Sequence, residues 1–571
     1  MAFQISPGVN VSEVDLTTVV PSTLTTSGAF AGRFQWGPAN KIKLIDNEIT
    51  LTKTFGEPNS NTATSFFTCS NFLAYGNNLQ VVRSIATGTL NADANTLQPN
   101  IQITNEDSYE ATYLNVSSSN LYGPFVARYA GALGNSIKVE VFDSANTTLF
   151  NSWAYKSYFT STPGTSSQAA AAGGSNDEMH IIVVDAGGLI TGVPGTILET
   201  YPFISKAFDA TINGASTYYK QVIFNNSKYI YVMDPVDYAN TSATWGSAST
   251  TSFARISSLT YTGGNYSITL AGGVDAAPTS GNIQTGYSLF SNKENIDISL
   301  VLTGDAAVGV QQYIIDNISV ARGDCVTFIS PPSANVVNQV GSETTNIQAW
   351  LTALGRSSSY VVADSGWKYQ YDKYNNVYRW IPLNGDIAGL CVYTDTVKDT
   401  WFSPAGFNRG AIKNCIKLAW NPTKTYRDTL YAAGVNPVVT FPGQGTILFG
   451  DKTLQSKPSA FDRINVRRLF IALEKSITKA AQYSLFELND EFTRAQFVSL
   501  VTPFLRDIQG RRGITDFKVV CDTTNNTSNV IDSNQFVGDI YIKPARSVNF
   551  IQLNFVAVAT GVDFNTIVGV A

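Results

Sequence analysis

Apolar runs of strand length alternate with helix-length stretches in two separate parts of the chain. The first part predicts a strand at 28–32, a helix at 65–75 that ends at Gly76, and a strand at 79–83. The second part predicts alternating strands and helices at 298–302, 308–320, 325–330, 345–354 and 360–363, followed by a hairpin that turns at Asn375-Asn376. This order of strand, helix and strand indicates a mainly parallel sheet covered by helices.

The stretch between these two parts has a different character. Residues 91–290 are rich in Thr, Ser, Asn, Gly and Tyr, and short alternating runs such as 181–184 and 229–232 are separated by clusters of turn-forming residues. This pattern predicts one or two β-rich modules inserted at the surface of the α/β domain.

The last part of the chain predicts two helices and three strands. A long helix over 461–483, opened by Ser459, places apolar residues on one arc and basic residues on the opposite arc. A second helix begins at Asn489, is kinked or ended by Pro503, and has Gly510 as its C-terminal cap. The strands are predicted at 517–521, 536–543 and 548–558, and the last of them places Ile551, Leu553 and Phe555 on one face.

Each end of the chain carries an extended stretch with no pairing partner nearby in the sequence. At the N-terminus this is the polar and apolar alternation of residues 5–16, and at the C-terminus it is residues 562–570. Since an isolated strand is not stable, we expect such a stretch to be held by another element, another chain being one option.

These patterns predict an α/β and α+β multidomain fold. The 571 residues are enough for several domains with sizeable cores. The predicted parts are an N-terminal arm (1–20), a discontinuous α/β middle domain (21–95 with 291–455), an inserted β-rich region (96–290), an α+β core domain (456–560) and a C-terminal arm (561–571).

Composition argues against an enzyme. Only 14% of the residues are charged, and His180 is the single histidine, so a His–His metal site or a Ser–His–Asp triad has at most one candidate residue. The five cysteines are widely spaced without a CxxC pair, as is typical of buried side chains in a reducing compartment. The sequence shows no secretion signal and no apolar run of membrane-spanning length. We therefore assign no catalytic residue, metal or cofactor.

Charge is distributed unevenly along the chain. The net charge is −5, whereas residues 398–479 contain 13 basic and 5 acidic side chains. Such a segment is either a solvated patch whose acidic partners lie elsewhere in the fold, or a docking surface for an acidic protein or nucleic acid. The acidic protein is favoured over nucleic acid because aromatic residues are not interleaved with the basic helical face.

One segment imitates an enzyme motif. Residues 445–453 resemble a phosphate-binding loop, but Asp451 separates Gly450 from Lys452, and no helix follows directly. A turn before the next helix is the better interpretation. His180, in an apolar strand, is interpreted as a surface or hydrogen-bonded side chain rather than a ligand.

Several motifs resemble those of the tail sheath proteins of contractile-tailed bacteriophages. In the N-terminal part these are Ser-Pro-Gly-Val at 6–9, Trp-Gly-Pro at 36–38, Phe55-Gly56, 72–76, 81–83 and 127–135. The more specific motifs are Gly-Asp-Lys-Thr at 450–453, the stretch 461–469 and Gly-Arg-Arg-Gly at 510–513. The resemblance covers residues 1–135 and 300–571, and 136–290 depart from it.

The resemblance implies a tail-sheath core and a structural, non-enzymatic function. Such a subunit stacks as hexameric rings around a tail tube and contracts to drive the tube through the host cell envelope. It is assembled in the host bacterial cytoplasm into the virion tail. Its partners are other copies of itself, the tail tube, the baseplate and the tail terminator, with no direct contact to nucleic acid and no membrane insertion.

The resemblance also implies three sets of interacting residues. Terminal arms add strands to the C-terminal sheets of neighbouring subunits, and the arm residues are Ile5, Val9, Val11, Glu13, Asp15, Phe564, Ile567 and Val568. The sheet that receives them contains Ile540, Ile542, Ile551, Leu553 and Phe555. The face toward an acidic tube contains Arg463, Arg467, Arg468, Lys475 and Lys479. We expect the replacement of Arg467 and Arg468 by Glu to weaken assembly on the tube more than folding.

Two alternatives remain open on the sequence. The sheath of a bacteriocin or of a secretion-type contractile injection system would share the same core. Another β-rich virion protein, such as a baseplate or adhesin protein, would need no paired terminal arms.

Overall fold

The structure is a computed structural model that describes residues 20, 25–94, 101–114, 123–233, 246–253, 265–549 and 551–553. The predicted arm residues at both ends and Phe555 lie outside the described residues. The chain divides into two compact units. The larger unit contains Ser22–Thr400 and Pro404–Thr478, and the described part of the smaller unit consists mainly of Trp401–Ser403 and the residues from Lys479 on.

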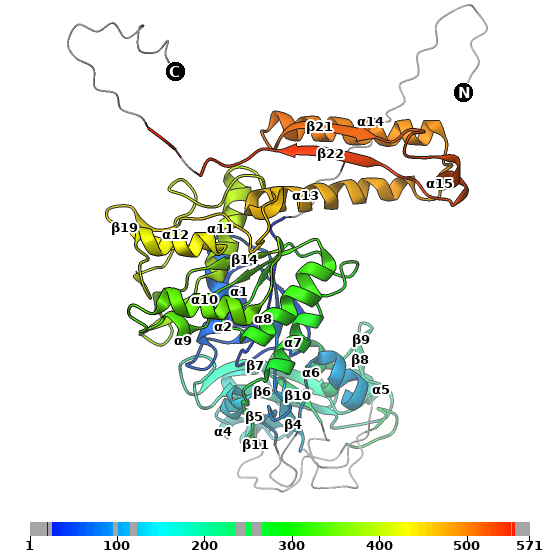
Figure 1. Ribbon diagram of the computed structural model, residues 1–571. Coiled ribbons are helices and arrows are strands. Elements are labelled where there is room, and N and C mark those ends of the chain that lie inside the picture. Colours follow the sequence, from blue (N-terminus) through cyan, green and yellow to red (C-terminus); the bar gives the residue numbers. More distant parts are fainter. Residues whose placement is uncertain are drawn as a thin grey trace, which may run out of the picture. The chain divides into compact units, whose positions relative to one another are not determined.

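A seven-stranded sheet forms the centre of the larger unit (Figure 1). Its strands, in spatial order, are β18 (Val435–Asn436), β14 (Val361–Asp364), β13 (Val326–Ile329), β12 (Leu300–Leu302), β1 (Gly28–Gly32), β3 (Leu79–Arg83) and β2 (Ile42–Ile45). All neighbours pair in parallel except β2 and β3. The predicted parallel sheet, assembled from two distant parts of the chain, is therefore confirmed.

Helices cover both faces of this sheet, as expected for parallel strands. Phe30 of β1 points into a core formed with the first set of helices, whereas Ala29 and Ala31 point into a core on the opposite face. The first set contains α1 (Glu48–Phe55), α2 (Ala63–Leu73) and α11 (Asn384–Val397). On the other side lie α7 (Ser280–Ser288), α8 (Val308–Ile314) with its π-helical extension Ile315–Val320, α9 (Ser333–Val336) and α10 (Glu343–Leu354).

The region between the two parts forms antiparallel sheets with a core of their own. A four-stranded sheet has the order β11 (Asn265–Thr269), β5 (Ile137–Phe142), β6 (Glu178–Asp185) and β7 (Thr196–Ser205), and β4 (Phe125–Ala127) pairs with β10 (Ile230–Val232). The remaining elements are α3 (Glu106–Tyr109), α4 (Thr147–Ser152), α5 (Ser167–Ala171), α6 (Tyr219–Asn226), β8 (Thr211–Ile212) and β9 (Ala215–Ser216). These strands gather at the lower end of the larger unit in Figure 1.

Two hairpins, a short strand and a helix follow in the larger unit before the C-terminal elements. The predicted hairpin is confirmed: β15 (Trp367–Asp372) pairs with β16 (Val377–Pro382), and Asn376 in the turn has a φ of 53°. The other elements are β17 (Lys417–Leu418), α12 (Lys424–Ala432), β19 (Val438–Phe441) and β20 (Gly445–Leu448). The sheet β19–β20 is a second hairpin.

The C-terminal elements differ from the prediction in their bounds. Ser459 opens only a single turn (Ala460–Asp462), and the long helix α13 runs from Ile464 to Ala481. The helix α14 (Glu491–Gly510) continues through Pro503, so the chain does not leave the helix there. The smaller unit also contains β21 (Ile514–Val520), α15 (Ser528–Asp532) and β22 (Asp539–Pro544).

The predicted third strand at 548–558 is wrong over its described part. Residues 545–549 and 551–553 form no strand, and Ile551 and Leu553 are exposed. The alternation of polar and apolar residues is present, but no described strand pairs with this stretch, and alternation alone does not hold a strand.

Candidate assembly surfaces

The basic residues of α13 do not form an exposed face, and the expectation that Arg467, Arg468 and Lys475 are available to a partner is wrong. The two terminal guanidinium nitrogens of Arg468 donate to the carboxylate of Asp395, at 2.9 and 2.7 Å, and both side chains are buried. Arg467 lies between two rings, 4.2 Å from the centroid of Tyr360 and 3.9 Å from that of Phe461.

Lys475, further along α13, is also engaged by the protein itself. The Lys475 ammonium donates to the Asp297 carboxylate at 2.7 Å and to the Ile298 carbonyl at 2.7 Å. Arg463, at the start of the helix, is partly exposed and lies near Asp451, and Lys479 is exposed at the beginning of the smaller unit. The positive arc is thus mostly internal because the helix is packed on both arcs, and buried charges require such partners.

The sheet of β21 and β22 is a second candidate surface. Its register pairs Phe517 with Ile542 and Val519 with Ile540, and α14 packs against β21. Ile540 and Ile542 are half-buried and alternate with the exposed Tyr541. Within the described residues, neither outer edge of this sheet is paired. Two strands are marginal by themselves, and an open edge is a template for another strand.

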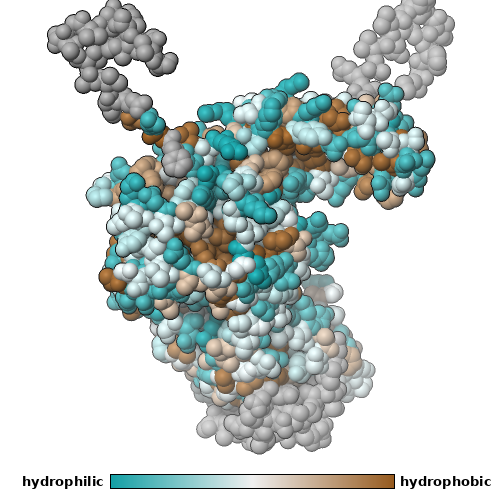
Figure 2. Space-filling model, in the orientation of Figure 1, coloured by the Kyte–Doolittle hydropathy of each residue, from teal (hydrophilic) through white to brown (hydrophobic). Residues whose placement is uncertain are grey.

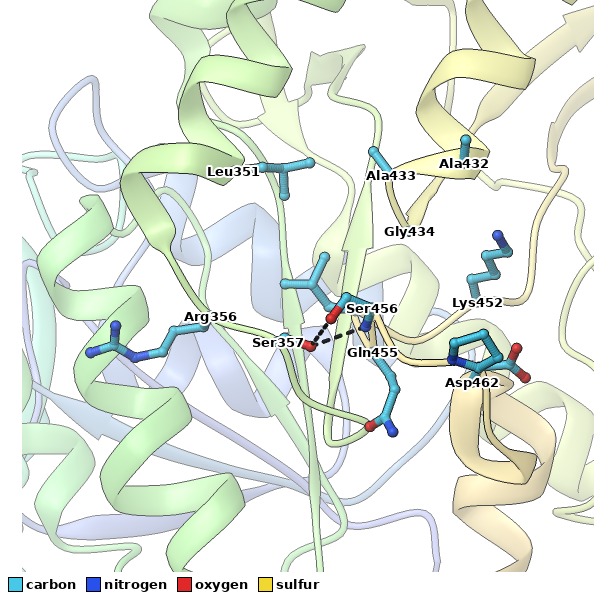
Figure 3. A pocket seen from close by; sticks show the side chains of 12 residues that line it. Leu351, Arg356, Ser357, Ala432, Ala433, Gly434, Lys452, Gln455, Ser456 and Asp462 are labelled. Atoms are coloured by element: carbon cyan, nitrogen blue, oxygen red, sulfur yellow. Dashed lines mark hydrogen bonds between the residues drawn. The ribbon is translucent and has the colours of Figure 1, made fainter.

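The segment that imitates a phosphate-binding loop contributes Lys452 to a pocket of about 300 Å³ (Figure 3). The Lys452 ammonium donates to the Tyr431 carbonyl at 2.7 Å, and its backbone N–H donates to Asn436 Oδ1 at 2.7 Å. The backbone N–H groups of Thr453 and Leu454 also donate to carbonyl oxygens of the protein.

The other charged groups of this pocket are engaged as well. Arg356 is bound to Asp316 by three contacts of 2.8 to 3.1 Å, and Figure 3 shows it on the side opposite Lys452, with the Ser357–Ser456 hydrogen bond between them. A phosphate loop needs backbone N–H groups that point at the ligand, and in this segment they already bind the protein. The geometry is that of a strand end and a turn.

Three parts of the chain match domains of one family. Residues 28–83 match the tail sheath protein Gp18 domain III N-terminal region, residues 303–454 the phage tail sheath protein central domain, and residues 456–557 the phage tail sheath C-terminal domain. The tail sheath protein of Vibrio phage KVP40 is 34% identical, and the match covers 99% of this chain and 100% of that protein. The chain belongs to the phage tail sheath family.

Further similarities agree with this assignment. The tail sheath protein of Enterobacteria phage T4 is also 34% identical, over 99% of each chain. A solved structure of a sheath tail protein from Listeria innocua shares the fold, with a TM-score of 0.51, 12% identity, and coverage of 92% of this chain and 96% of that one. The sheath protein described here is therefore a structural protein of a bacteriophage tail.

Two titratable groups inside the sheath protein, His180 and Cys391, are buried. His180 Nδ1 accepts a hydrogen bond from the Phe203 N–H at 3.1 Å, and its Nε2 donates to the Ser161 carbonyl at 2.8 Å. Burial lowers the pKa of this imidazole and raises that of the Cys391 thiol to about 11, so both groups are neutral at pH 7. His180 is thus a hydrogen-bonded structural residue, one of the two roles expected for it.

Neither a metal site nor a membrane span emerges from the described ranges. They contain no group of three or more His, Cys, Asp or Glu side chains placed to hold a metal ion. Among the helices that are described, none combines the length and the apolar character needed to cross a bilayer.

Proposed function

We propose that this sheath protein polymerises as stacked hexameric rings around a tail tube and contracts to drive the tube through the host cell envelope. Assembly takes place in the host cytoplasm, with the tube, the baseplate and the tail terminator as partners. The observation that carries the proposal is the two-stranded sheet β21–β22, whose outer edges are unpaired within the described chain.

The terminal arms are the proposed occupants of these edges. Residues 5–16 and 562–570 have strand-like alternation and no partner in their own part of the sequence. An arm from a neighbouring subunit that adds a strand would form main-chain hydrogen bonds worth about 0.5–1.5 kcal/mol each. Such a connection can turn about the arm without breaking while subunits change their packing during contraction.

The proposed energy source for contraction is the lattice and not a nucleotide. An extended sheath would hold subunits in a metastable packing, and contraction would release them into a more stable one. The engagement of Lys452 and of the neighbouring N–H groups with the protein supports this part of the proposal.

Polymerisation of arm variants tests the strand addition. We expect Val9→Pro with Val11→Pro to abolish tubes in negative-stain electron microscopy, because proline has no N–H donor and does not extend a sheet. The matched control, Val9→Thr with Val11→Thr, keeps β-branched side chains and every N–H, and should still form tubes. Deletion of 1–20 or of 561–571 should also prevent them. Normal tubes from both deletion variants would refute the role of the arms.

A further inference from the structure

Three phenylalanine rings lie beside one another on the larger unit, with Phe407 and Phe449 exposed and Phe441 half-buried. The centroids of Phe407 and Phe441 are 5.4 Å apart and those of Phe441 and Phe449 are 5.2 Å apart. Phe407 is 54% and Phe449 is 41% exposed. The Arg427 guanidinium lies 5.8 Å from the centroids of Phe441 and Phe449. We call these four residues the aromatic patch.

The aromatic patch lies in a segment with more basic than acidic side chains. Residues 400–450 contain five basic side chains and a single acidic one, Asp428. The stretch from Gly406 to Ile412 runs beside β20, because Gly406 donates to the Leu448 carbonyl and Ile412 to that of Thr446. Arg427 thus places a positive charge of the basic segment 398–479 beside these rings, whereas Arg467, Arg468 and Lys475 of α13 are engaged inside the fold.

The connection between α13 and α14 is also apolar and exposed, but its charged side chains are acidic, whereas the charged side chain of the aromatic patch is basic. We call residues 483–492 the apolar tip. Its exposed apolar side chains are Tyr483, Leu485, Phe486, Leu488 and Phe492, each at least 64% exposed. Apolar, brown side chains are visible at the surface of the smaller unit in Figure 2. A surface of this kind on a soluble chain marks an interaction site.

The apolar tip contains three acidic residues, Glu487, Asp490 and Glu491, and no basic one. Asp490 caps α14 by accepting from the Thr493 N–H at 2.8 Å, whereas Glu487 and Glu491 are exposed. Phe486 has a φ of 69°, a backbone conformation that a bulky residue rarely adopts.

We propose that the apolar tip of one subunit docks on the aromatic patch of a second copy of the chain. The two surfaces are complementary, since each is apolar at its centre and they differ in the sign of their charge. They are also different parts of the molecule, so a contact that is not reciprocated between the same two copies is heterologous and propagates into a ring or a helix. This inference rests on the proposed sheath function and adds a contact that does not involve the terminal arms.

Charge exchange tests the docking. We expect Glu487→Lys with Glu491→Lys, and separately Arg427→Glu, to raise the protein concentration needed for polymerisation about tenfold, because each places like charges opposite one another. Combining all three substitutions should bring it back to within about threefold of the unaltered chain. Glu294→Lys, an exposed reversal elsewhere on the larger unit, is the control and should have no effect. Circular dichroism verifies that each variant is folded.

A cross-link identifies which copies meet. A copy with Phe486→Cys is mixed with a differently tagged copy with Phe449→Cys, under mild oxidation, with the unaltered chain as control. We expect a disulfide between the two tags, in solution as well as in tubes, so the readout does not depend on polymerisation.

Three outcomes would overturn the docking. These are unchanged polymerisation of the Glu487→Lys, Glu491→Lys variant, loss of its assembly on a tail tube with self-polymerisation intact, and the absence of a disulfide between the two tagged copies. Failure of the unaltered chain to form tubes would count against the proposed sheath function, and the cross-link in solution would still decide the docking.

Discussion

Arg468 and Asp395 show how a single residue can be misread from a helical pattern. The pattern places Arg468 on the polar arc of α13, but α11 lies against that arc and supplies both Asp395 and the Cys391 carbonyl as partners. A polar arc predicts exposure only when no other element carries matching charges. The acidic partner is 73 residues away in the sequence, so spacing alone could not reveal it.

The first prediction concerns this ion pair. Arg468→Ala leaves the Asp395 carboxylate buried without its partner, so we expect the larger unit to lose about 3–5 kcal/mol of stability. Urea unfolding of the unassembled chain measures this loss. Lys293→Ala, which removes an exposed charge elsewhere on the larger unit, should change it by less than about 0.5 kcal/mol. Equal effects of the two substitutions would contradict the burial of the pair.

A second prediction concerns Asp364. Burial raises the pKa of its carboxyl to about 8, while Ser330 and Gly366 donate hydrogen bonds to it. In the unfolded chain the pKa is near its ordinary value of 3.8. The folded chain therefore holds an extra proton between about pH 4 and pH 8, and the contribution of this group to stability falls as the pH rises through that window.

Asp364→Asn removes this titration. We expect the thermal midpoint of the variant to change less between pH 5 and pH 8 than that of the unaltered chain. Glu294→Gln, an exposed acid of the larger unit, should leave the pH dependence as it is. An unaltered slope in Asp364→Asn would show that other groups cause the pH dependence.

Elements with a clear period were predictable, and elements without one were not. The strands β1, β3, β12, β13 and β14 and the helices α2, α8 and α10 follow from apolar runs and helical spacing, whereas β2 and α1 were missed. The helix α11 was missed because it is buried almost all round and so has no polar arc to give it a period. The opposite error occurs at 551–553, where polar and apolar residues alternate as in a strand but no strand forms.

The packing of α11 on α2 leads to a third prediction. A Cβ on Gly389 would lie 2.4 Å from the ring of Tyr75, which is too close for real side chains. We expect Gly389→Ala to destabilise the larger unit by about 1–3 kcal/mol through overpacking. Gly309→Ala in α8 is the matched control: its Cβ would meet no atom within 4 Å, and alanine should stabilise an exposed helical position. Thermal unfolding of both variants compares them directly.

At the scale of the whole molecule, the sequence identified the family and the terminal arms as candidates, but it placed the positive charge on the wrong surface. The segment 398–479 does contain an excess of basic residues, but Arg468 and Lys475 of the helix α13 form ion pairs with acidic residues of the same chain. The aromatic patch combines residues from three separate segments around Phe407, Arg427 and the hairpin β19–β20. No spacing rule brings these segments together before the fold is known.

A fourth prediction follows from this distribution of charge. If the aromatic patch and the apolar tip meet, raising the salt concentration from 0.05 to 0.5 M should weaken polymerisation of the unaltered chain, because screening reduces the attraction between exposed charges. Glu487→Gln with Glu491→Gln should make polymerisation less sensitive to salt. Light scattering at several protein concentrations measures both. Equal salt sensitivity of the two chains would count against an electrostatic part of the contact.

The open edges of β21 and β22 have a consequence for how this protein can change over generations. A strand that joins such an edge is held through its main chain, which nearly every amino acid provides equally well. A terminal arm that adds such a strand must only avoid proline and keep its alternation of polar and apolar residues. We therefore expect substitutions to accumulate more freely in the terminal arms than in the sheet β21–β22 that receives them. Subunits whose arms have diverged should still be able to assemble together.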